Sequence, residues 1–117
     1  MNESKLSMNL ISREELKEKL DRGDQFKLVN ALGEWAFEAK RIPGSINISN
    51  MRDARNMLDP DDIVIHCSNP SCIASIIGYQ ILTSMGYKKV RRYAGGISDW
   101  EDLGYPLEGS FVDQSKN

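Results

Sequence analysis

The strongest constraint on the fold is the segment Asp62-Ile63-Val64-Ile65-His66-Cys67. Three consecutive β-branched residues stand between an acidic turn and a cysteine, which predicts a central strand of a parallel sheet, covered on both faces. Turn residues follow, and from Ala74 or Ser75 apolar residues recur at helical spacing until Gly86. The sequence therefore predicts a strand, a loop and a helix in succession, with Cys67 at the end of the strand.

Other strands and helices are predicted to alternate around this unit. The strand-like segments are 8–11, 26–32, 45–49 and 89–93, and the helix-like segments are 12–23, 33–40, 51–58 and 98–103. Ser12, followed three residues later by Glu15, forms a capping box at the start of the first helix. Such alternation predicts an α/β fold with a parallel sheet and right-handed crossovers. Ligands of these sheets bind at the carboxyl ends of the strands, where we expect Cys67.

Length and charge limit the classes of function. The 117 residues suffice for one domain, which we expect over residues 8–109, with flexible ends at 1–7 and 110–117. The formal net charge is -2, and the longest basic runs are the pairs Lys88-Lys89 and Arg91-Arg92, which argues against nucleic acid as a partner. Apolar runs are short and the N-terminus is polar, so we expect a cytoplasmic protein without membrane contact.

The two cysteines, Cys67 and Cys72, are five positions apart. A disulfide framework of a small secreted domain uses more cysteines with wider loops. His66 is the only histidine, so the chain offers at most three Cys or His ligands, whereas structural zinc takes four. We therefore expect no metal, and redox, nucleophilic or inert thiols remain.

The order of landmarks along the chain resembles the rhodanese domain over about residues 8 to 109. These landmarks are Ile11-Ser12, Leu28-Val29-Asn30-Ala31, Arg41-Ile42-Pro43-Gly44-Ser45-Ile46, His66-Cys67, Gly86-Tyr87-Lys88-Lys89-Val90, Gly95-Gly96 with Trp100, and Gly104-Tyr105-Pro106-Leu107. The resemblance implies a three-layer α/β/α rhodanese-like fold with a central five-stranded parallel sheet. It also implies a sulfurtransferase in which Cys67 carries sulfane sulfur as a persulfide, between a small sulfur donor and a thiol acceptor.

The chain departs from the family pattern at several positions near this cysteine. Asn30 stands where the family usually has an acidic residue, Leu32 replaces an arginine, and Arg41 replaces a histidine. The loop is also longer, because Ser75 lies eight positions after Cys67. These departures give weight to a second hypothesis, a catalytically inactive rhodanese-like module for protein interaction or regulation.

A reactive thiol at Cys67 has a physical rationale in its predicted surroundings. Thiolate is the nucleophilic form of cysteine, and the N-terminus of a helix favours it. Backbone N–H groups of the loop would hold an anionic sulfur, so the chemistry needs no cofactor. The predicted catalytic residue is Cys67, and the substrate-binding loop consists of Ser68, Asn69, Pro70, Ser71, Cys72, Ile73 and Ala74.

Each of these residues also has a plainer interpretation. Cys67 could simply be a small apolar residue that ends a buried strand. Cys72 is either a resolving thiol, which would form an intraloop disulfide with Cys67 in a thiol-disulfide redox protein, or a packing residue. Adjacent strand residues point to opposite faces, so His66 is expected to diverge from the Cys67 thiol. Phosphatase chemistry is disfavoured because no arginine lies between Cys67 and Arg91 to close the loop on phosphate.

Overall fold

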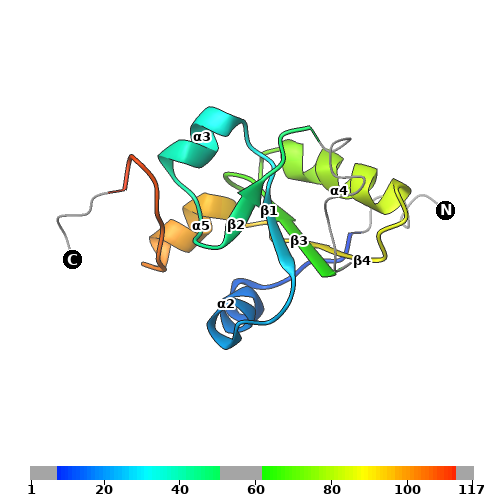
Figure 1. Cartoon of the computed structure of the whole chain (residues 1–117), viewed down its shortest axis with the longest axis horizontal. Helices are drawn as coiled ribbons and strands as arrows, with labels where there is room; N and C mark the ends of the chain where they lie inside the picture. The colour runs from blue at the N-terminus through cyan, green and yellow to red at the C-terminus, as the bar shows by residue number, and fades with distance from the viewer. Residues whose placement is uncertain (1–7, 51–61, 113–117) are drawn as a thin grey trace.

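The computed structural model describes residues 8–50 and 62–112, and within them four strands form one parallel sheet (Figure 1). The strand order is β2-β1-β3-β4. The strands are β1 (Lys27–Asn30), β2 (Ser45–Asn47), β3 (Asp62–His66) and β4 (Lys89–Arg92). β3 lies between β1 and β4, with Asp62 opposite Lys89 and Asn30 opposite His66. The segment Asp62–His66, which most constrains the fold, is therefore a central strand, as predicted.

The fifth strand expected at residues 8–11 is reduced to a single bridge. Leu10 forms an isolated parallel bridge with Arg92, the last residue of β4. The Ile11 N–H donates to the Arg92 carbonyl at 3.1 Å, and the Arg92 N–H donates to the Asn9 carbonyl at 2.8 Å. The first helix begins at Arg13, directly after its N-cap, so the chain leaves the sheet edge before a ladder can extend. The described sheet thus has four strands instead of five.

The helices are α2 (Arg13–Arg22), α3 (Glu34–Ala39), α4 (Ala74–Ser84) and α5 (Gly96–Asp102). The capping residue of α2 is the predicted one, because Ser12 Oγ accepts a hydrogen bond from the Glu15 N–H at 3.1 Å. The C-cap of α2 is Gly23, whose left-handed φ of 72° suits glycine. α5 begins two residues earlier than expected. The helix predicted at residues 51–58 lies outside the described residues.

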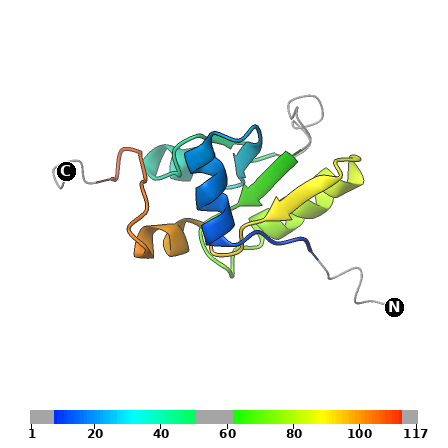
Figure 2. The ribbon, with the colours of Figure 1, turned by 90° about the horizontal axis from the view of Figure 1, so that it is seen from below.

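Helices cover both faces of the sheet, which gives the predicted three layers. On one face, Val29, Ile65 and Val90 pack with Tyr79 and Leu82 of α4. On the other face, Leu28 and Val64 pack with side chains of α2 and α5, namely Leu16, Ile97 and Trp100. Figure 2 shows α2 in front of the strands and α4 behind them. The alternation of Leu28 with Val29 and of Val64 with Ile65 therefore divides the apolar residues between two cores.

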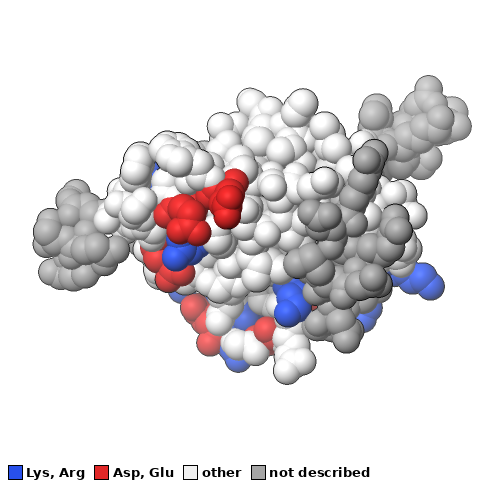
Figure 3. All heavy atoms as spheres, turned by 45° about the horizontal axis from the view of Figure 1, so that its top comes forward, with Lys and Arg blue, Asp and Glu red and all other residues white. Residues whose placement is uncertain are grey.

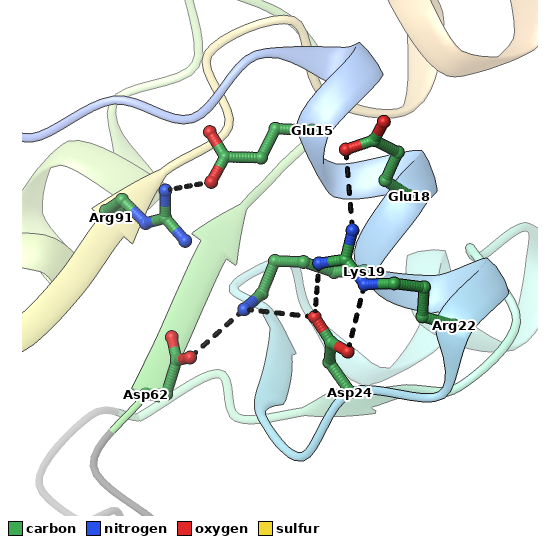
Figure 4. A network of polar contacts seen from close by, with 7 residues as sticks. All are labelled: Glu15, Glu18, Lys19, Arg22, Asp24, Asp62 and Arg91. Atoms are coloured by element: carbon green, nitrogen blue, oxygen red, sulfur yellow. Dashed lines mark hydrogen bonds and ion pairs between the residues drawn. The ribbon is translucent and has the colours of Figure 1, made fainter.

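A polar network holds α2 on the sheet (Figure 4). Lys19 extends from α2 toward β3, where its Nζ lies 3.0 Å from an Asp62 carboxylate oxygen. Arg91 of β4 points to the same side and its Nη1 lies 2.7 Å from Glu15 Oε2. Successive residues of a strand point to opposite faces. Arg91 therefore faces α2, and its neighbour Arg92 faces the core beneath α4.

The described chain continues past residue 109 and remains attached to α3. The Ser110 N–H donates to the Glu38 carbonyl at 3.0 Å, and the Phe111 N–H donates to the Ala39 carbonyl at 2.8 Å. The rings of Trp35 and Phe111 meet edge to face, 5.4 Å apart. The tail expected to be flexible from Ser110 onward thus begins with bonded residues. The remaining end segments, 1–7 and 113–117, lie outside the described residues.

Candidate active site at the Cys67 loop

Cys67 directly follows β3 and lies beneath the first turn of α4. Its side chain belongs to the core on the α4 face and is 1% exposed. The loop runs through residues 68–73, with Ile73 as the N-cap of α4. The first bond of the helix joins the Ile77 N–H to the Ile73 carbonyl, and the preceding N–H groups of this turn have no partners within the helix. The predicted succession of strand, cysteine, loop and helix N-terminus is present.

Cys67 and Cys72 form a disulfide, with their Cα atoms 6.4 Å apart. The loop turns back on itself to bring them together. The Cys72 N–H donates to the Asn69 carbonyl at 3.1 Å, and the Ser71 N–H donates to Asn69 Oδ1 at 2.9 Å. Cys72 is only partly buried, whereas Cys67 is enclosed. In this oxidised form, Cys67 therefore offers no free thiol.

The beginning of the loop is held by the start of α5. The Ile97 N–H donates to the Cys67 carbonyl at 3.0 Å, and the Ser98 N–H donates to the Ser68 carbonyl at 2.8 Å. Gly96 has a φ of +68°, and a Cβ at this position would lie 2.6 Å from the Cys67 carbonyl oxygen. In the sequence, Gly95-Gly96 stood out only as one of the landmarks of the family resemblance. Its second glycine also permits a close backbone approach to the cysteine.

Arg92 is a site residue that sequence analysis missed. It is 7% exposed, and its Nε–H donates to Ser75 Oγ at 2.9 Å while an Nη2–H donates to the Pro70 carbonyl at 3.3 Å. Burial lowers the pKa of Arg92, but a guanidinium remains protonated at neutral pH. The alternation of side chains along β4 could have identified Arg92 from the sequence. It places Arg92 on the same face as the apolar Val90, at the strand end where ligands bind.

Ser75 connects this arginine to the cysteine. Its Oγ lies 3.2 Å from Cys67 Sγ, and the side chain is buried in the first turn of α4. Sequence analysis treated Ser75 only as a residue at the start of the helix. Three elements therefore contribute to the surroundings of the sulfur atom: β3 supplies Cys67, α4 supplies Ser75 and β4 supplies Arg92.

His66 lies on the opposite face, as predicted. Its ring centroid is 6.4 Å from that of Tyr93, and its Nδ1 lies 3.2 Å from the Cys67 carbonyl oxygen. Complete burial lowers the pKa of His66 to about 4, so the ring is neutral at pH 7. His66 thus contacts the backbone of Cys67 but does not face its sulfur.

The three residues that depart from the family pattern, Asn30, Leu32 and Arg41, make contacts away from the Cys67 sulfur. Asn30 is buried, and its Oδ1 accepts a hydrogen bond from the Leu32 N–H at 2.9 Å, which closes the turn after β1. The side chain of Leu32 packs against the core on the α4 face. Arg41 pairs with Glu108, with 3.2 Å between Nε and Oε1. None of these three contacts involves the loop of residues 68–73.

The surface beside the loop is uncharged where α4 forms it. No Asp, Glu, Lys or Arg occurs in α4, and the surface between α3 and α4 is white in Figure 3. Ile73 and Ile77 are 64% and 47% exposed there. A pocket of about 540 Å³ lies next to Ile77, lined by Ala31, Ser49, Asn50, Ala74, Ile77, Gly78 and Ile81. The α4 surface beside the loop is therefore uncharged and exposes two isoleucine side chains.

Two other kinds of feature are absent from the described part of the chain. Residues 8–50 and 62–112 contain no cluster of three or more His, Cys, Asp or Glu side chains arranged to hold a metal ion. The helices within those ranges are also too short or too polar to span a membrane.

Comparison with known proteins identifies the family. Residues 12–103 match the family described as the rhodanese-like domain. Among solved structures, the protein BH2092 of Bacillus halodurans superposes with a TM-score of 0.80 at 20% identity, covering 97% of this chain and 90% of that one. Human single-domain sulfurtransferase TSTD1 gives 0.70 at 24% identity, covering 82% and 97%.

A longer enzyme also contains a similar domain. Thiosulfate sulfurtransferase of Pseudomonas aeruginosa gives a TM-score of 0.74 at 22% identity, covering 92% of this chain but 21% of the enzyme. None of the curated proteins matches this sequence. At these identities, the structural likeness establishes a shared fold.

Proposed function

This chain belongs to the rhodanese-like domain family, and we propose from that membership that it is a single-domain sulfurtransferase whose Cys67 carries sulfane sulfur. The observation that carries the proposal is the position of Cys67. Its sulfur lies beneath the N-terminal turn of α4 and within 3.2 Å of a serine hydroxyl. Both surroundings favour an anionic sulfur.

The proposed reaction has two displacements. The Cys67 thiolate attacks the outer sulfur of a donor such as thiosulfate, the sulfur–sulfur bond of the donor breaks, and sulfite leaves with the bonding electrons. The persulfide left on Cys67 is then attacked at its outer sulfur by an acceptor thiolate. The acceptor leaves as a persulfide and Cys67 returns as thiolate. Backbone N–H groups of the loop would hold the negative outer sulfur between the two steps. Pro70 has no N–H, and the N–H groups of Ser71 and Cys72 donate to Asn69, so the others of residues 68–74 would serve.

The disulfide requires one step before this cycle. Cys67 is bonded to Cys72, so a dithiol reductant must first reduce both sulfurs and become a disulfide itself. A cytoplasmic location, which we propose as well, would keep the cysteines reduced. The reduced chain is therefore the working form in this proposal.

The test is to reduce the protein, remove the reductant under anaerobic conditions and add thiosulfate. Intact-mass spectrometry of the Cys72→Ser variant should show a gain of one sulfur atom, removable by dithiothreitol. The Cys67→Ser variant, which keeps Cys72, should show no such gain. If neither thiosulfate nor an organic persulfide loads Cys67, the sulfurtransferase proposal fails and a non-catalytic interaction module becomes the better account.

The Cys67–Cys72 disulfide supports a second candidate, a thiol-disulfide redox protein. Peroxide would oxidise the Cys67 thiolate to a sulfenic acid and be reduced to hydroxide. Cys72 would then attack that sulfur, releasing water and forming the disulfide. Mild peroxide treatment followed by peptide mass spectrometry should give the Cys67–Cys72 crosslink. An uncrosslinked Cys67 sulfenic or sulfinic acid as the main product would contradict this second function.

A further inference from the structure

Among the arginines of the described ranges, Arg92 differs in its partners. Arg13, Arg22, Arg41 and Arg91 each lie within ion-pair distance of a carboxylate. Within residues 8–50 and 62–112, the contacts of Arg92 are instead Ser75 Oγ and the Pro70 carbonyl, although its side chain is buried. A buried cation is costly unless an anion or hydrogen bonds compensate it. On the other side of Ser75, 3.2 Å from its Oγ, lies Cys67 Sγ, which can become an anion.

The direction of the hydrogen bonds links these three residues. A guanidinium has only donors, so the Arg92 Nε–H occupies a lone pair of Ser75 Oγ. The hydroxyl keeps its own hydrogen for another acceptor, and Cys67 Sγ lies 3.2 Å away. A thiolate accepts such a bond better than a thiol or a disulfide sulfur does. Donation from Arg92 also polarises the hydroxyl and strengthens its bond to the sulfur.

We propose that Arg92, acting through Ser75, is a positioning residue that stabilises the thiolate of Cys67. This inference rests on the proposed function, in which that thiolate is the nucleophile. Ser75 touches the reacting sulfur, and Arg92 sets the direction of the serine hydroxyl. The same pair stabilises Cys67 when it is released from a persulfide or a disulfide.

The other titratable groups around Cys67 do not oppose this effect. Tyr79 of α4 shares the core with Cys67, and its hydroxyl accepts a hydrogen bond from the Asn9 N–H at 3.0 Å. Tyr87 packs at the edge of the same core, His66 is neutral and turned to the other face, and Cys72 is the disulfide partner. Arg92 is the charged side chain bonded to Ser75, whose Oγ lies 3.2 Å from the sulfur.

Arg92 also has a structural role, because its bond to the Pro70 carbonyl ties the loop to β4. The test therefore needs a readout that loop tethering alone would not move. The chain has two cysteines, so Cys72→Ser leaves Cys67 as the single thiol. The rate of Cys67 alkylation by iodoacetamide, measured against pH, then reports its pKa directly.

In this Cys72→Ser background, Arg92→Met and Ser75→Ala should each move the alkylation profile to higher pH. A shift of one pH unit corresponds to about a tenfold lower alkylation rate below the pKa. Ser75→Thr keeps a hydroxyl and should restore the parent profile. Arg91→Met is the matched control, since Arg91 is the neighbouring residue of β4 and pairs with Glu15 on the other face. Its profile should equal the parent's.

Unchanged profiles for Arg92→Met and Ser75→Ala, in variants whose circular dichroism matches the parent, would overturn the inference. Equal shifts in Ser75→Ala and Ser75→Thr would also overturn it, because they would reflect packing instead of the hydroxyl. If Arg92→Met fails to fold, the two serine variants still decide. Thiosulfate loading of the parent is measured separately. Shifted alkylation profiles without loading would reject the sulfurtransferase proposal but keep the role of Arg92 and Ser75. Loading with unshifted profiles would keep the sulfurtransferase proposal and reject that role.

Discussion

The Cα of Gly96 lies so close to the backbone of Cys67 that a side chain has no room between them: an added Cβ would come within 2.6 Å of the Cys67 carbonyl oxygen. This contact brings the Ile97 N–H to the same carbonyl. The start of α5 is therefore held against the loop that follows Cys67, and a residue 29 positions beyond Cys67 helps to set the conformation of that loop.

Gly96→Ala should accordingly destabilise the protein by roughly 1–3 kcal/mol, through the left-handed backbone conformation and the clash with the loop. Persulfide loading of Cys67 should decrease as well. Urea unfolding followed by tryptophan fluorescence gives the stability. Gly33→Ala is the control, since Gly33 has a negative φ and open space around its Cα. Equal stability of the two variants would show that the close approach is not required.

Cys72 should change the fate of a persulfide on Cys67. With no external acceptor, the Cys72 thiolate of the wild type should attack Cys67 Sγ, expel hydrosulfide and re-form the disulfide. One equivalent of sulfide is therefore expected per chain after a single loading with thiosulfate, as measured with a sulfide electrode. Cys72→Ser should retain the persulfide and release no sulfide. A stable persulfide on the wild type would rule out Cys72 as the resolving thiol.

His66 should make the stability depend on pH. Its pKa is about 4 in the folded protein and about 6.5 when exposed, so the unfolded chain binds the proton more tightly. The free energy of unfolding should be unaffected by this group above about pH 6.5, and should decrease as the pH falls toward 4. The full effect is about 3 kcal/mol.

Urea titrations between about pH 6.5 and pH 5 isolate the histidine, because most carboxylates remain ionised there. His66→Gln should have a lower overall stability but a flatter pH dependence in this window. The same slope in the variant and the wild type would show that His66 is not the group responsible.

Lys19 should contribute to stability more than the partly buried Lys17, two positions before it. Its Nζ, on a side chain that is 9% exposed, lies 3.0 Å from Asp62 and 4.0 Å from Asp24 (Figure 4). Lys19→Met keeps the packing of the stem and should cost about 1 kcal/mol. Lys17→Met removes an i,i+4 pair with Asp21, worth about 0.3–0.5 kcal/mol, and a weak contact of the ammonium with the Tyr105 ring. Differential scanning calorimetry compares the two, and equal melting temperatures would contradict the prediction.

Much of the fold could be predicted because its signals are local. β3 follows from consecutive β-branched residues, α4 from apolar residues at helical spacing, and the start of α2 from Ser12 with Glu15. The structure of the segment at the edge of the sheet, beside β4, was less predictable. Residues 8–11 have the composition of a strand, but an edge segment pairs on one side only, and here it forms a single bridge before α2 begins.

By itself, the sequence determined the family and the position of Cys67 between a buried strand and a helix N-terminus, because neighbouring residues carry those patterns. Only the tertiary structure decided what surrounds the sulfur. Ser75 is 8 positions away and Arg92 is 17 positions beyond Ser75, on another strand. The sequence contains no arginine within the loop, yet β4 brings a buried guanidinium beneath it. The physical reason is that strand pairing and helix packing, which join distant segments, decide which buried polar groups share hydrogen bonds.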